Sequence, residues 1–277
     1  MTTTLTKPVE APPVEELDTH PRHRNPRFNR KFVTSWIAVA VLLAAWQVLP
    51  KLGVVDRTFL PPLSDVLHAW WQLATNGDLW MDVKASMRRS LTGFAIALMA
   101  GVPLGLLIGW YPLAAELLSP LFAIFLNTAA LALLPVFTLI LGIGETSKIS
   151  IIVYASLWPI LYNTISGVRT VDPLLIKSAR SLGVGQLTLF QKVILPAAVP
   201  AIFTGARLAG AASILVVITA EMVGARAGLG YLIMNSQFNF QIPQMYAGIL
   251  TVSAIGVSFN YLLSALERRF STWRTAS

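Results

Sequence analysis

The sequence predicts an all-α integral membrane protein with about six transmembrane helices. Hydrophobic residues make up 55% of its 277 residues and charged residues only 12%, whereas soluble domains average about 45–50% and about 25%. The apolar residues gather in six runs, each long enough to cross most or all of a hydrocarbon core of about 30 Å as a helix. These runs cover residues 32–49, 91–111, 120–142, 149–168, 200–223 and 246–265.

Charge and cysteine content exclude several classes of function. The net charge is +8, but the basic residues are spread between the apolar runs instead of forming one patch, so we expect no nucleic-acid partner. The chain has no cysteine, which excludes disulfides, thiol nucleophiles and cysteine-bound metals. Its three histidines show no metal-ligand spacing, and we expect neither a metal nor a cofactor.

The ends of the chain differ from its centre. Residues 1–31 are rich in proline, threonine and charge and are predicted to be a disordered basic tail. Residues 32–270 form the predicted transmembrane domain, and 271–277 a second tail. The run 32–49 exceeds the apolar region of a signal peptide, about 7–15 residues, so we interpret it as a span. Six spans place both termini on the side that carries about twice as many Lys and Arg, which is the cytoplasm.

A polar, basic segment, residues 172–196, separates the fourth and fifth runs. Asp172 and Pro173 indicate a helix start, and Gly183 is suited to end that helix. A second short helix is predicted from 186 to 195, ending at Pro196. The expected apolar positions are Leu175, Ala179 and Leu182 on the first helix and Leu187, Phe190 and Ile194 on the second. From the pattern alone, the two helices either rest on anionic lipid or fit a groove on a soluble partner.

The same segment resembles the cytoplasmic loop of bacterial ATP-binding-cassette (ABC) importer permeases. Their pattern is Glu-Ala-Ala, three residues, Gly, nine residues, Ile, one residue, Leu-Pro. This chain has Lys177-Ser178-Ala179, Gly183, Val193 and Leu195-Pro196 at those positions. The spacing matches throughout, although Lys177 replaces the Glu and Ser178 the first Ala. In such permeases the loop forms coupling helices that sit in a cleft of the ATPase subunit.

The resemblance covers about residues 58–270 and is closest to permeases that import nitrate, sulfonates, taurine or bicarbonate. It rests on GVPLGLLIG at 101–109, GIGETSK at 142–148, GVRTVDPLL at 167–175, TGARLA at 204–209 and EMVGARAGLGYLI at 221–233. The chain departs from the family in LNTAALALLP, where Asn127, Ala129 and Ala130 stand in place of expected prolines. We therefore expect the third span to have a different shape.

The resemblance implies a permease subunit in the bacterial inner membrane that forms the pathway for a small anionic solute. It implies as partners two cytoplasmic ABC ATPase subunits, a second permease chain in a homodimer, the lipid membrane and an extracytoplasmic binding protein. The chain itself has no G-x-x-x-x-G-K-[ST] motif, so it is not expected to hydrolyse ATP. The alternative function is an ATP-independent channel or a membrane-embedded enzyme.

Three groups of residues are candidate sites. The coupling loop would use Lys177, Ser178, Ala179, Leu182, Gly183, Leu187, Phe190, Leu195 and Pro196. Small residues recur every four positions in the second span and predict close helix packing; they are Gly93, Ala97, Gly101, Gly105 and Gly109. Polar residues in or beside spans are candidates for the pathway or a gate: Asn127, Asn163, Glu221, Arg88 and Arg89.

The polar candidates carry specific hypotheses. Arg88 and Arg89 would lie at the outer mouth and attract an anionic substrate, with surface solvation as the alternative. Glu221 would either reach the headgroups or bond to the outer loop AGLGYLI at 227–233. Arg207 is too far along the same helix to pair with Glu221.

Overall fold

The computed structural model describes residues 27–270, and this part of the chain is helical without strands. This confirms the predicted all-α fold. Two short irregular turns, η1 (Ala130–Leu133, a 3₁₀ turn) and η2 (Phe190–Ile194, a π turn), join neighbouring helices. The α-helices are α1 (Arg27–Lys51), α2 (Leu63–Asn76), α3 (Asp78–Trp110), α4 (Pro112–Asn127), α5 (Leu134–Leu141), α6 (Glu145–Arg169), α7 (Pro173–Ser181), α8 (Gln186–Leu189), α9 (Leu195–Met222), α10 (Leu229–Phe238) and α11 (Ile242–Phe270).

The described residues contain four helices that are long and apolar enough to cross a membrane: α3, α6, the continuous run 186–222 and α11. A fifth span results if α4 and the η1–α5 segment count as one, because the pair is bent by 84°. The part of α1 from Trp36 to Lys51 is a shorter apolar helix. The prediction of six spans therefore stays a prediction.

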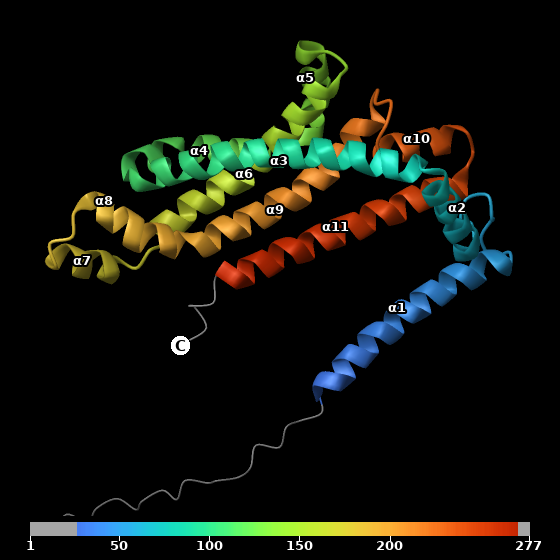
Figure 1. Ribbon diagram of the computed structural model, residues 1–277, viewed down its shortest axis with the longest axis horizontal. Helices are drawn as coiled ribbons and strands as arrows, with labels where there is room; N and C mark the ends of the chain where they lie inside the picture. The colour runs from blue at the N-terminus through green and yellow to red at the C-terminus, as the bar shows by residue number, and fades with distance from the viewer. Residues whose placement is uncertain (1–26, 271–277) are drawn as a thin grey trace, which may run out of the picture. The chain divides into compact units, whose positions relative to one another are not determined.

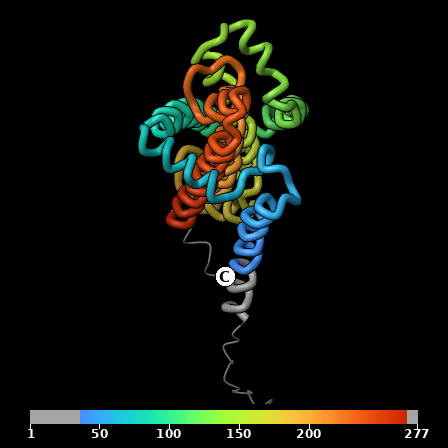
Figure 2. The backbone as a smooth tube through the Cα atoms, turned by 90° about the vertical axis from the view of Figure 1, so that its right-hand side faces the viewer, coloured from blue at the N-terminus to red at the C-terminus, as the bar shows by residue number. Residues whose placement is uncertain are grey.

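The chain divides into two units, one ending at Trp46 and the other beginning at Gln47. In the second unit α6 packs against α3 and α9, and α9 packs against α11. Figure 1 shows α7 and α8 at one end of this bundle and α2 and α10 at the other. Figure 2 views the same helices after a quarter turn, and in both views α5 stands away from them.

The small residues of α3 form its contact with α6. Gly93, Ala97, Gly101, Gly105 and Gly109 are all buried. An added Cβ would lie 2.5 Å from Ile152 Cγ2 at Gly93 and 2.6 Å from Thr164 Cβ at Gly105. Gly101 faces Ile160 and Gly109 faces Val168 in the same way. The two series advance together along the sequence, so α3 and α6 run parallel with their backbones in close approach.

The third predicted span is bent after α4, although the prolines expected there are replaced by Asn127, Ala129 and Ala130. The Asn127 side chain donates to the Ala123 carbonyl at 2.7 Å, and Thr128 Oγ1 donates to the Ile124 carbonyl at 2.8 Å. These side chains bond the last carbonyls of α4, as Asn and Thr do at helix ends. Pro135 stands in the first turn of α5, where proline is tolerated.

Two expectations about helix ends were wrong. Pro196 does not end the helix after the coupling loop, because α8, η2 and α9 form one continuous run from Gln186 to Met222. In η2 the Leu195 N–H bonds the Phe190 carbonyl five residues back, and this wider turn accommodates the proline ring and its missing N–H. The stretch AGLGYLI is not a loop throughout, because α10 begins at Leu229.

Candidate functional site

The segment 172–196 forms two helices joined by a glycine turn. Asp172 caps α7 by accepting the Leu174 N–H at 2.8 Å, and Pro173 occupies the first turn. Gly183 has a φ of 74°, the left-handed conformation that favours glycine. The Gly183 N–H bonds the Arg180 carbonyl and the Val184 N–H bonds the Ala179 carbonyl. These two bonds make a Schellman motif, which fixes the direction in which the chain leaves α7.

The inner face of this helix pair packs on the ends of the long helices. Ala179, Leu189 and Ile194 are buried together with Val168 at the end of α6 and Val171 just after it. The Phe190 ring meets the Trp110 ring of α3 edge to face, with centroids 5.2 Å apart. These contacts hold α7 and α8 against α3 and α6.

The outer face of the pair carries exposed leucines. Leu182 is 83% exposed and Leu187 is 71% exposed, while Lys177, Ser178 and Arg180 are exposed beside them. Leu175 is also exposed, so it does not share a face with the buried Ala179 as we expected. The buried stripe of α7 instead combines Ile176 and Ala179, one turn apart. Exposed leucines beside cations offer a partner both apolar and charged contacts.

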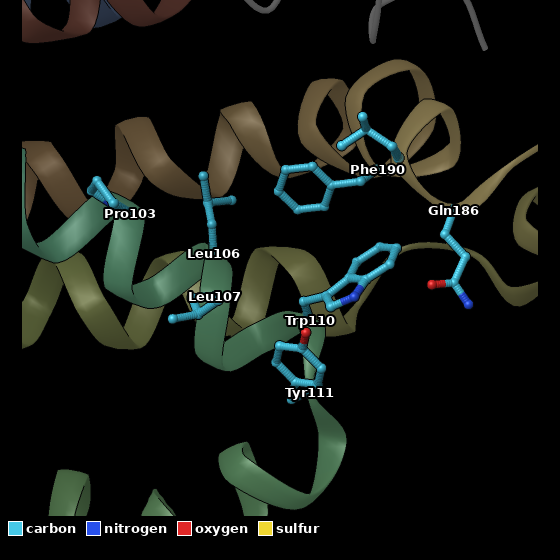
Figure 3. Close-up of a pocket in the computed structure, with 8 residues that line it drawn as sticks. Pro103, Leu106, Leu107, Trp110, Tyr111, Gln186 and Phe190 are labelled. Carbon is cyan, nitrogen blue, oxygen red and sulfur yellow. The ribbon is translucent and has the colours of Figure 1, made fainter.

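A pocket of about 520 Å³ opens where α8 meets the end of α3. Figure 3 shows Phe190 next to Trp110, with Leu106 and Leu107 on α3 and Gln186 at the edge of the pocket. Phe190 is therefore only partly buried by its own chain and lies beside a hollow.

A network of ionic and hydrogen bonds lies at the opposite end of the bundle. Arg89 of α3 bonds Glu145 of α6 in a bidentate manner, with Nε–Oε2 and Nη2–Oε1 distances of 2.8 and 2.6 Å. Its Nη1 also donates to Glu221 Oε1 of α9 and to the Ala227 carbonyl, each at 2.7 Å. Arg89 and Glu221 are 4% and 1% exposed. One guanidinium thus joins three helices and the loop before α10.

The same network holds the start of α10. Asp82 Oδ1 accepts the Gly228 N–H at 2.7 Å, and Ser86 Oγ accepts the Leu229 N–H at 2.8 Å. Glu221 Oε2 accepts the Gly230 N–H at 3.0 Å. Ser86 in turn donates to the Glu221 carboxylate. Carboxylates that accept free N–H groups at a helix start are favourable there.

Comparison with known proteins agrees with this architecture. Residues 101–272 match the family described as the binding-protein-dependent transport system inner membrane component. The chain is 34% identical over 244 residues to the putative aliphatic sulfonates transport permease protein of Escherichia coli, covering 88% of this chain and 93% of that one. It is 30% identical to the nitrate import permease protein of Leptolyngbya laminosa, covering 87% and 88%. The chain belongs to this permease family.

A solved structure supports the fold of the permease. The inward-facing MetNI methionine ABC transporter gives a TM-score of 0.59 at 18% identity, covering 67% of this chain and 93% of that chain. The likeness extends over the helical bundle and carries no statement about substrate. Together with the family match, it confirms an inner-membrane component of a binding-protein-dependent transport system.

The structure shows the partners of four charged residues of the permease. Arg89 is not a free cation at a mouth, because it is buried and bonded to two carboxylates. Arg88 is exposed and lies 3.4 Å from Glu145. Glu221 is buried and does not extend to headgroups; its carboxylate accepts the Gly230 N–H within the AGLGYLI stretch. Arg207 pairs with Glu267 of α11 at 3.3 Å.

Sequence reasoning missed most of the network. Asp82, Ser86 and Arg89 lie at positions i, i+4 and i+7 of α3, a polar stripe on one helix face. The expected span began at residue 91, so this stripe was interpreted as lying outside the helix. Glu145 is part of GIGETSK, a stretch that supports the family resemblance and lacks the P-loop spacing, and the sequence pattern indicates no partner for its carboxylate. Helical periodicity extended upstream of residue 91 would have revealed the stripe.

The two asparagines occupy different settings. Asn127 lies at the end of α4 and lines a groove between α4 and α6. Asn163 is half-buried, and its Nδ2 donates to the Pro159 carbonyl at 2.8 Å. An added Cβ at Gly205 of α9 would lie 2.8 Å from Asn163 Cβ, so Asn163 lies in the contact between α6 and α9.

Proposed function

We propose that two copies of this permease form the translocation pathway of an ATP-driven importer for a small anion. Two cytoplasmic ATPase subunits dock on the α7–α8 pairs, and a binding protein delivers the solute from outside. Both chain termini then lie in the cytoplasm. The anionic substrate class follows from the sulfonate and nitrate permeases to which the chain is similar.

The outer face of α7–α8 is the observation that carries this proposal. Two leucines that are more than two-thirds exposed project from a helix pair whose inner face is packed on α3 and α6. Exposed leucines on a helix supply anchors for a groove on a partner. Since the inner face is packed against α3 and α6, a movement of the partner bound to the outer face is transmitted to those helices directly.

The distribution of charge supports the proposed orientation. Arg169, Lys177, Arg180 and Lys192 all lie in or beside the α7–α8 pair, and basic residues favour the cytoplasmic side. The cluster of Arg89, Glu145 and Glu221 lies at the other end of the bundle, which is the outer side in the proposed orientation.

Co-purification tests the proposed function. The chain, tagged at its C-terminus and extracted in mild detergent, is expected to bring down a P-loop ATPase in a ratio of about one to one. Purified with its binding protein in liposomes, the complex is expected to take up an anion only with ATP. A chain that purifies alone and transports or reacts without ATP would support a channel or a membrane-embedded enzyme instead.

A further inference from the structure

The permease has a second polar surface, a groove of about 540 Å³ between α4 and α6. Glu116 at the start of α4 lies 3.4 Å from Arg169 at the end of α6, and Phe125 stacks on Trp158 with centroids 4.5 Å apart. The two helices are therefore antiparallel along the groove. It runs from the α7–α8 end of the bundle to the break after α4.

Each helix contributes a polar stripe to this groove. The polar residues that line it are Ser119 and Asn127 on α4 and Tyr162, Ser166 and Arg169 on α6, and Glu116 pairs with Arg169. The hydroxyls of Ser119, Tyr162 and Ser166 make no hydrogen bond to another described residue. Unpaired polar groups on a span are costly in hydrocarbon, so this face is suited to water or a polar ligand.

The opposite face of α4 is apolar. Leu113, Leu117, Leu121 and Ile124 recur at helical spacing there and are exposed. This face is suited to lipid, which leaves the polar stripe to face a pathway. One helix thus separates an apolar surface from a polar one.

Arg169 forms a cationic end of the groove, and its present anionic partner can be replaced. Its side chain is 43% exposed, and its single ionic partner in the described chain, Glu116, is 66% exposed. A pair this exposed contributes little stability, so another anion can replace the carboxylate. Arginine is suited to this role because its planar guanidinium binds oxyanions through two parallel hydrogen bonds.

The remaining wall of the groove is apolar. Phe122 and Leu126 of α4 and Ile165 of α6 line it between the polar ends. From Tyr162 to Arg169 the groove extends about 10 Å, at 1.5 Å per helical residue. A nitrate ion has no apolar part to place against this wall, whereas a short alkyl chain has.

We infer that the α4–α6 groove is a substrate site that binds an organic anion with a short alkyl tail, such as an alkanesulfonate, in preference to an inorganic anion. The sulfonate head contacts Arg169 in place of Glu116, and the tail lies along Phe122, Leu126 and Ile165. This inference rests on the proposed function and names its substrate class.

Calorimetry on the purified, nucleotide-free complex with its ATPase tests the inference, using 1-hexanesulfonate and nitrate as probes. Hexanesulfonate is expected to bind at least tenfold more tightly than nitrate. Arg169→Gln is expected to weaken its binding at least tenfold, whereas Glu116→Gln, which breaks the same ion pair, leaves it equal or tighter. Leu126→Asn should weaken hexanesulfonate binding and leave nitrate unchanged. Arg268→Gln, which removes an exposed cation in the last turn of α11, outside the groove, should change neither.

Three results would overturn the inference. They are equal binding of the two probes, unchanged hexanesulfonate binding by Arg169→Gln, and an equal loss in Arg169→Gln and Glu116→Gln. Failure of both probes to bind would overturn it as well. ATP-dependent uptake by the same complex tests the proposed function separately. An importer that carries nitrate alone would agree with the proposed function and contradict the proposed site.

Discussion

At the scale of single residues, Arg89 and Arg88 show how burial separates two neighbouring cations. Arg89 has 5% of its side chain exposed and makes ionic contacts with two carboxylates. Arg88 has 72% exposed and makes one long contact. The two residues are neighbouring arginines in the sequence, yet only Arg89 belongs to the buried network.

Replacing Arg89 is expected to destabilise the permease strongly. Arg89→Gln leaves the buried Glu221 without its cation, and breaking a buried pair costs about 3–5 kcal/mol. Arg88→Gln is the matched control and should cost less than about 1 kcal/mol. The loss of stability of each variant is measured by thermal unfolding in detergent, with size-exclusion chromatography as the readout of folded protein. Equal melting of the two variants would contradict the role given to Arg89.

Gly230 is required by the contact between α9 and α10. An added Cβ there would collide with the Ile218 carbonyl oxygen and lie 2.8 Å from Glu221 Cβ. Gly230→Ala is therefore expected to lower the melting temperature and the yield of folded protein. Gly256 has nothing within 4 Å of an added Cβ, so Gly256→Ala should be neutral or stabilising, by up to about 1 kcal/mol. A stable Gly230→Ala variant would show that the two helices separate easily.

At the scale of helices, the glycine ridge of α3 determines its contact with α6. Gly105→Ala places a Cβ 2.6 Å from Thr164 Cβ and is expected to cost about 1–3 kcal/mol through overpacking. Adding Thr164→Gly removes that Cβ and should restore part of the loss. Unfolding of the single and double variants checks this, and a double variant less stable than Gly105→Ala alone would argue against the proposed close approach.

Gly183 is expected to control coupling through the direction of the chain between α7 and α8. An added Cβ meets nothing within 4 Å, but the φ of 74° is strained for a branched residue. Gly183→Val is expected to abolish ATP-dependent uptake while the protein still inserts, whereas Gly183→Asn, which tolerates this conformation, should keep most of it. Normal uptake by Gly183→Val would contradict the importance of the turn.

Much of the helical architecture is predictable from local patterns. The recurrence of small residues every four positions predicts the ridge of α3, and Asp172-Pro173 with Gly183 predicts the ends of α7. The π turn before Pro196 and the bend after α4 are not predictable in this way, because they depend on how backbone bonds rearrange. The polar stripe of α3 was predictable by periodicity, but the ionic partners of Arg89 were not, because Glu145 and Glu221 lie on two helices distant in sequence.

At the scale of the whole molecule, the two ends of the bundle differ in chemistry. One end presents exposed leucines and cations on α7–α8, and the other joins α3, α6, α9 and α10 through buried charges. The end with the buried charges is therefore held together by several bonds, and the groove between α4 and α6 begins at the other end, where Arg169 lies. This arrangement suits a machine driven from the α7–α8 end.

Cysteine cross-linking tests the central claim, that an ATPase docks on α7–α8. Because the chain has no native cysteine, Leu182→Cys provides a single thiol at a position that is 83% exposed, and Leu139→Cys on α5 provides a control at 86%. We expect Leu182→Cys in membranes to cross-link to a P-loop ATPase and Leu139→Cys not to do so. An absence of cross-linking from Leu182, or equal cross-linking from both positions, would contradict the docking surface.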